Sequence, residues 1–277
     1  MSDKKVSCYK KQQGSLIFSS HGCGPWPILG DPRHVNLIDF LKNIPSTLIS
    51  PSAILVISGH WEEDSPTVQG SAQPPMLYDY YNFPEESYQI SYPAPGYPEL
   101  AHRISSILKQ NSIESKVDMQ RGYDHGVFVP LMIMYPEATI PCLQLSLLNS
   151  LDPKDHIQIG RALKDLRNEN ILIIGSGASF HNLLGFREVP TPETIALNEG
   201  FEAWLQNVMT NSQLSETERE EQLINWLDAP GARYCHPREE HLLPMHVCYG
   251  LAGCPANRVI EVEYMERKAS MYIWSTD

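Results

Sequence analysis

Five short apolar runs along the chain have the pattern of β-strands that are buried on both faces. They span residues 15–20, 53–59, 141–147, 171–175 and 258–264. Between them, stretches with helical periodicity predict helices at about 35–43, 98–110, 127–135, 154–167, 197–210, 216–228 and 241–252. Strands that alternate with helices indicate βαβ units. We therefore predict an α/β fold: a single domain with a twisted, mostly parallel central sheet flanked by helices on both faces.

One segment, residues 62–97, departs from this alternation and is rich in proline and tyrosine. A connection of this length inside a compact domain is either functional or disordered. Its aromatic content favours an ordered segment. We expect residues 74–97, together with Trp61, either to wall a pocket or simply to cover the sheet. The polar first residues carry no such pattern. We expect residues 1–14 to form a flexible N-terminal tail and residues 15–277 to form the domain.

Composition narrows the choice of partners. The chain has 277 residues, of which 42% are hydrophobic and 19% charged, as in an ordinary globular protein. The net charge of −12 has no basic block to offset it, which argues against nucleic acid and anionic membranes as partners. The six cysteines form no CxxC pair, and the first residues lack the apolar region of a secretory signal. A cytoplasmic protein is expected; its oligomeric state is left open.

Histidines carry the candidate chemistry, because three of the apolar runs lead into one. These are His21, His60 and His181. In open α/β sheets ligands bind beyond the carboxyl ends of the strands, and imidazole is the commonest metal ligand. We expect these side chains to share one site. Two more, His125 and His241, stand beside turns near the starts of predicted helices.

The remaining histidines are expected to serve other purposes. His34, His102 and His156 lie in polar, helix-like surroundings and are predicted to be at the surface. His236 and His246 flank His241 and are assigned to packing or to support of the site. No HExxH spacing is present, so local spacing alone does not establish a metal site.

Nucleophilic catalysis is a weaker alternative. Residues 175–179 read Gly-Ser-Gly-Ala-Ser, which superficially resembles a nucleophile elbow with Ser176 or Ser179 as the nucleophile. A GxSxG motif would need glycine at position 181, where His181 stands. Cys23 beside His21 is a further candidate nucleophile of the same rank.

Six segments in order carry a family resemblance. They are Ser20-His21-Gly22, Ser58-Gly59-His60-Trp61, Tyr92-Pro93-Ala94-Pro95-Gly96, Tyr123-Asp124-His125-Gly126, Phe180-His181-Asn182-Leu183 and Glu240-His241-Leu242-Leu243-Pro244. From about residue 15 to 275 the chain resembles the class III extradiol ring-cleavage dioxygenases, in the 4,5-DOPA dioxygenase branch related to the LigB subunit of protocatechuate dioxygenase. The resemblance implies a single α/β domain that inserts O2 into a catechol-type ring, with DOPA or another small catechol as the substrate.

The resemblance also implies a cofactor and roles for the histidines. The family uses non-haem Fe(II) for activity, and its members are often isolated with Zn(II). The metal ligands match His21, His60 and His241, the last replacing a glutamate of the LigB proteins. His125 and His181 match the acid/base residues. We rank His181 first as the group that takes the second catechol proton, and His181 is also a candidate fourth metal ligand.

Two other functions stay open at this point. Three histidines and a water also make a hydrolytic zinc site, so a zinc-dependent hydrolase is one alternative. A non-catalytic binding protein similar to the Memo proteins, which resemble this fold, is the other. One departure from the family concerns the substrate: Cys23-Gly24 follows His21 where many members have a serine-proline pair.

Overall fold

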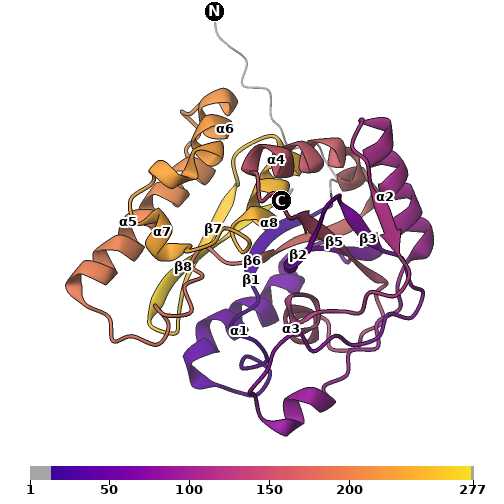
Figure 1. The fold of residues 1–277 in the computed structure, drawn as a ribbon, viewed down its shortest axis with the longest axis horizontal. Coiled ribbons are helices and arrows are strands. Elements are labelled where there is room, and N and C mark those ends of the chain that lie inside the picture. Colours follow the sequence, from indigo (N-terminus) through magenta and orange to yellow (C-terminus); the bar gives the residue numbers. More distant parts are fainter. Residues whose placement is uncertain (1–13, 276–277) are drawn as a thin grey trace, which may run out of the picture.

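The computed structural model describes residues 14–275, which build one eight-stranded sheet with helices on both faces (Figure 1). Its strands are β1 (Leu16–Ser20), β2 (Ala53–Glu63), β3 (Thr67–Gln69), β4 (Lys116–Asp118), β5 (Cys142–Leu148), β6 (Ile171–Gly177), β7 (Arg258–Tyr264) and β8 (Arg267–Trp274). Their order across the sheet is β4-β3-β5-β2-β6-β1-β8-β7. The pairs β2/β5, β2/β6, β1/β6 and β3/β4 are parallel, so the predicted mostly parallel α/β sheet is confirmed.

The central strands are apolar on both faces because each face is covered. In β1, Leu16 and Phe18 point into one core cluster while Ile17 points into the other, and all three are at most 1% exposed. Successive side chains of a strand alternate between faces, so a strand packed on both sides reads as an unbroken apolar run. This is the pattern that made β1, β2, β5 and β6 visible in the sequence.

The α-helices divide between the two faces of the sheet. They are α1 (Val35–Asn43), α2 (Pro98–Gln110), α3 (His125–Met134), α4 (Pro153–Ala162), α5 (Pro192–Thr210), α6 (Glu216–Ile224), α7 (Ala232–Cys235) and α8 (Leu243–Ala252), with 3-10 turns at 32–34, 44–47, 85–89, 164–169 and 226–228. α1 and α3 pack together on one face, and α4 packs with α8 on the other. Among the described residues no helix is both long and apolar enough to cross a membrane.

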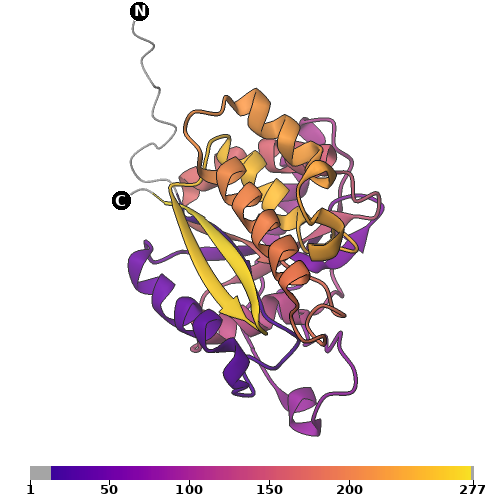
Figure 2. The same cartoon turned by 90° about the vertical axis from the view of Figure 1, so that its left-hand side faces the viewer.

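The sequence predicted β7 but missed β8, so it did not reveal that the two form a hairpin. β7 pairs antiparallel with β8, and β8 pairs antiparallel with β1. Figure 2 looks onto this hairpin, with α1 to one side and α5 to the other. Its turn residues, Met265 and Glu266, have φ of 52° and 60°. Such turns normally carry Asn-Gly or Asp-Gly, so a Met-Glu turn gives no signal in the sequence.

Most predicted helices agree with the structure, and two end earlier than expected. α4 ends at Ala162 and α6 at Ile224, each followed by a 3-10 turn where one longer helix was predicted. The capping box that begins α6 has the Ser215 hydroxyl accepting from the Glu218 N–H while the Glu218 carboxylate accepts from the Ser215 N–H. The predicted tail lies outside the described residues except for Gly14.

Two of the three histidines assigned to the surface are instead buried. His34 and His156 are 0% exposed, whereas His102 is exposed as predicted. Each buried ring satisfies a backbone group: His34 Nε2 accepts from the Cys23 N–H at 3.3 Å, and His156 Nε2 accepts from the Leu148 N–H at 3.1 Å. Their polar neighbours in the sequence suggested solvent exposure, but each ring is buried and holds a loop in place through its hydrogen bond to the backbone. His34 thereby holds the turn that follows His21.

Candidate metal centre

Adjacent strands bring the strand-end histidines together. β6 lies between β2 and β1 in the sheet, and all three run parallel. His21 follows the last residue of β1, and His181 follows β6 by four residues. His60 lies within β2, where the pairing with β5 is interrupted between Ile57 and Glu62. An interrupted register re-aims the side chain at that point. The expectation that these histidines gather at one edge of the sheet agrees with this geometry.

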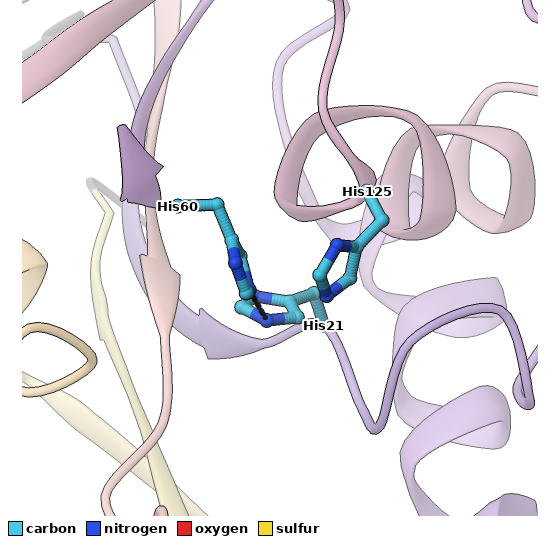
Figure 3. A group of neighbouring side chains, drawn as sticks. All are labelled: His21, His60 and His125. Atoms are coloured by element: carbon cyan, nitrogen blue, oxygen red, sulfur yellow. Dashed lines mark hydrogen bonds between the residues drawn. The ribbon is translucent and has the colours of Figure 1, made fainter. Parts of the chain in front are cut away.

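Three imidazole nitrogens face one another at this edge. His60 Nε2 lies 3.0 Å from His21 Nε2 and 3.1 Å from His241 Nε2. His241 comes from the turn before α8, far along the chain. Figure 3 shows the rings of His21 and His60 converging, with His125 of α3 beside them. The potential ligand atoms of these last three residues all lie within 4.8 Å of one another.

The surroundings of the Nδ1 atoms determine which nitrogen of each ring carries the hydrogen. Ser176 Oγ donates to the Gly126 carbonyl at 2.5 Å, so it can only accept from His21 Nδ1, 2.9 Å away. Glu240 Oε1 lies 2.9 Å from His241 Nδ1, and a carboxylate only accepts. Asp79 Oδ2 lies 3.3 Å from His60 Nδ1. The Nδ1 atoms of His21 and His241 therefore carry their hydrogens, and the Asp79 carboxylate near His60 favours the same tautomer there.

This tautomer leaves three Nε2 lone pairs aimed at one another with no hydrogen between them. Lone pairs held at 3.0 and 3.1 Å repel unless a cation lies among them. An imidazole that ligates a metal typically gives its other N–H to a carboxylate or a neutral acceptor, as His21 and His241 do here, and a carboxylate also lies near His60 Nδ1. The residues thus fit a metal ion with three nitrogen ligands. Such a set suits non-haem Fe(II) and Zn(II) alike.

Burial keeps these rings neutral. It lowers the pKa of His21, His60 and His241 well below the ordinary histidine value, and the surrounding imidazoles lower it further. A neutral imidazole is the form that binds a metal. The donor set is therefore ready to bind at neutral pH without first losing protons.

His125, on one side of the trio, is held by Asp79. The Asp79 Oδ1 atom accepts from the backbone N–H of His125 at 3.0 Å and from its Nδ1 at 2.8 Å. Burial raises the pKa of Asp79, but the hydrogen bonds and charge of His125, with His60, outweigh it and bring that pKa to about 2. Asp79 comes from the proline- and tyrosine-rich segment, and the sequence offered no signal for it.

His181, on the other side, is held by Glu240. Its Nδ1 lies 3.1 Å from the same Oε1 atom that accepts from His241. The rings of His181 and His241 are stacked, with centroids 3.4 Å apart and planes at 13°. Its backbone N–H donates to the Cys235 carbonyl. Glu240 stands next to His241 in a segment already noted, but its role could not be read from the chain.

An open hollow of about 380 Å³ borders the trio on the side of His181. It is lined by Gly59, His60, Glu62, His181, Arg238, Glu240 and His241. At its rim Arg238 forms a two-pronged ion pair with Glu62, both distances being 2.6 Å. The hollow gives small molecules access to the nitrogen cluster, and its rim carries charges of both signs.

One expectation needs correction, and one alternative that the sequence disfavoured also finds no support in the structure. Trp61 is 2% exposed, donates to Glu63 and packs under Arg121, so it supports β2 rather than walling a cavity. Ser176 is 1% exposed and has its hydroxyl hydrogen bonded to a carbonyl, which leaves it no freedom to act as a nucleophile. The sequence around Ser176 resembled a nucleophile elbow. In the structure Ser176 lies within β6, and its hydroxyl oxygen orients His21.

Comparisons with known proteins agree with this geometry. Residues 16–272 match the family described as the catalytic LigB subunit of aromatic ring-opening dioxygenase. The chain is 40% identical over 241 residues to a 4,5-DOPA dioxygenase extradiol of Beta vulgaris, covering 86% of each chain. It is 40% identical over 251 residues to dioxygenase tasH of Hapsidospora irregularis, covering 86% of this chain and 78% of that one.

Bacterial relatives extend the match. A 4,5-DOPA dioxygenase extradiol of Escherichia coli K12 is 33% identical over 255 residues, covering 90% of this chain and 89% of its own. The crystal structure of an uncharacterized Escherichia coli K12 protein superposes with a TM-score of 0.72 at 28% identity, covering 95% of this chain and all of the other. Family and fold therefore extend over nearly the whole described chain.

Proposed function

Because the chain belongs to the LigB family and is an extradiol ring-cleavage dioxygenase, we propose that it opens a small catechol in a metal-dependent reaction. The observation that carries the proposal is the convergence of three Nε2 lone pairs beside two further histidines. The relatives named 4,5-DOPA dioxygenase support a DOPA-like catechol as the substrate.

In this proposal His21, His60 and His241 hold the metal through Nε2. Three ligands on one side leave the other coordination positions open, as in the facial sites of non-haem iron oxygenases. A metal held by these residues would offer positions for catechol and O2 and would lower the pKa of a catechol hydroxyl. Fe(II) is the active metal, and Zn(II) binds the same nitrogens without supporting oxygen chemistry. His181 stays a candidate fourth ligand through its stacked position on His241.

Proton movement falls to the two flanking histidines. With its Nδ1–H facing Glu240, His181 presents a free Nε2 that takes the proton of the second catechol hydroxyl and later returns it. His125, anchored on Asp79, is the second choice for taking this proton, and once its Nε2 holds the proton it would be able to donate a hydrogen bond to an oxygen in the site. Each candidate has a carboxylate that fixes its tautomer, an arrangement typical of acid/base histidines.

The rim of the hollow bears on substrate choice. Arg238 and Glu62 place a positive and a negative group near His181. Charged groups of both signs are able to bind a catechol whose side chain carries a carboxylate and an ammonium group. On the other side, the ring of Tyr80 packs against His125, with the two ring centroids 5.7 Å apart.

Oxygen uptake tests the proposal. Metal-free protein is loaded with Fe(II) under anaerobic conditions, or with Zn(II) as the control, and then given O2 and a panel of catechols that includes L-DOPA. We expect uptake with a yellow ring-opened product in the iron form only. No uptake with any catechol, by protein shown to hold iron, would contradict the proposal and favour the hydrolase or binding alternatives.

A further inference from the structure

Asp79 lies in the long irregular segment, and its carboxylate faces two of the clustered histidines, His60 and His125. Its two oxygens face different rings. Oδ1 accepts from the backbone N–H and the Nδ1–H of His125. Oδ2 is buried, lies 3.3 Å from His60 Nδ1 and makes no hydrogen bond with the described residues. That oxygen is therefore free to accept a hydrogen bond from the Nδ1–H group of His60.

We propose that Asp79 is a positioning residue that fixes the protons of His60 and His125 with one carboxylate. The inference deepens the proposed function, since it takes His60 as a metal ligand and His125 as an acid/base group. A carboxylate has two acceptor oxygens and no donor, so it holds both Nδ1 atoms in the protonated form. Both Nε2 atoms then face the site with free lone pairs.

If Asp79 positions protons, Asp79→Asn should weaken zinc binding more than Asp79→Ala. If Asp79 only packs, the order should be reversed. In Asp79→Asn the amide oxygen is held by the two donors of His125, which outnumber the single donor of His60. The amide NH2 then faces His60 Nδ1 and opposes its N–H. His60 shifts its hydrogen to Nε2, where the lone pair for the metal is lost. In Asp79→Ala no group opposes His60, and either tautomer remains accessible.

The test measures zinc affinity of metal-free protein by competition with a chelator. Loss of the partner that orients a ligand typically costs 10–100-fold in metal affinity. We expect Asp79→Asn to weaken zinc binding by about this factor and Asp79→Ala to weaken it less, although asparagine is closer in shape to aspartate. Asp79→Glu keeps two acceptors and is expected to bind more tightly than Asp79→Asn. Glu85→Gln, an exposed acid of the same segment, is the matched control and should match the wild type.

A spectroscopic readout accompanies the affinities. In metal-free protein labelled with ¹⁵N-histidine, we expect the Nδ1–H signals of His60 and His125 to resist exchange with water in the wild type. In Asp79→Asn the His125 signal is expected to persist while the His60 signal is lost. Asp79 lies outside both core clusters, and circular dichroism of the metal-free variants verifies that they are folded.

Two results would overturn the inference. One is an Asp79→Asn protein that binds zinc as the wild type does, or more tightly than Asp79→Ala or Asp79→Glu. The other is a His125 Nδ1–H signal that is unaffected by Asp79→Ala. Neither readout involves turnover, so a failure of this inference is distinguishable from a failure of the catechol reaction, which shows in oxygen uptake alone.

Discussion

At the scale of single residues, the site is a set of imidazoles, and each has an oxygen acceptor close to its Nδ1 atom. Asp79, Ser176 and Glu240 fix the protons of the rings, and Asp79 and Glu240 each hold one proposed ligand and one proposed acid/base group. His21, His60 and His181 could be proposed as site residues because they follow apolar runs, whereas roles for His125 and His241 came from the family resemblance. Their partners could not, because an acid in an irregular segment has no pattern that points to a distant ring.

Replacing His181 with alanine tests the division of roles. If His181 moves the proton and is no ligand, turnover should fall by about 10²–10⁴-fold while the metal content stays unchanged. The measurements are kcat of the iron form and metal per chain. His102→Ala, at an exposed helical position, is the control. Loss of bound metal from the His181→Ala protein would instead identify His181 as a fourth ligand.

At the scale of elements, the ends of β1, β2 and β6 support the site, and close backbone contacts fix the loop of His241. A Cβ built on Gly177 of β6 would lie 2.1 Å from the His241 carbonyl oxygen. Only glycine allows so close an approach. Strand existence could be predicted from apolar runs, yet this contact and the β7–β8 hairpin could not. The contact joins residues 64 positions apart, and the hairpin turn lacks the usual residues.

The substitution Gly177→Ala tests whether this contact holds the His241 loop in place. The added methyl group must push the His241 backbone away from β6, so we expect zinc affinity to fall by at least the 10–100-fold seen when a ligand loses its orientation. Gly200→Ala, in the interior of α5, is the control, since its Cβ would meet only Pro230 at 3.1 Å. Chelator competition measures both. Unchanged zinc affinity in Gly177→Ala would show that the His241 loop is not held by this contact.

At the scale of the whole molecule, buried histidines away from the site link stability to pH. Burial lowers the pKa of His34 to about 4, of His236 to about 3 and of His246 to about 4. Each is neutral when folded but takes a proton near pH 6.5 when unfolded. Their contribution to stability is therefore complete above about pH 6.5 and is lost as the pH falls toward 4.

The free energy of unfolding of the metal-free protein should therefore decrease from pH 6.5 to 4. Each of these histidines contributes about 1.4 kcal/mol per pH unit. Glu202 acts in the opposite sense, because burial raises its pKa to about 7 and the folded state binds that proton more tightly. Urea unfolding at several pH values measures the sum. Stability that rises on acidification over this range would contradict the assignment of neutral buried rings.

The most direct test of the central claim is anomalous diffraction from crystals loaded with Fe(II) under anaerobic conditions. We expect one iron peak bound by the Nε2 atoms of His21, His60 and His241, with His125 and His181 alongside. A peak held instead by His181 and Glu240, or an iron-loaded protein with no peak at the three nitrogens, would contradict it.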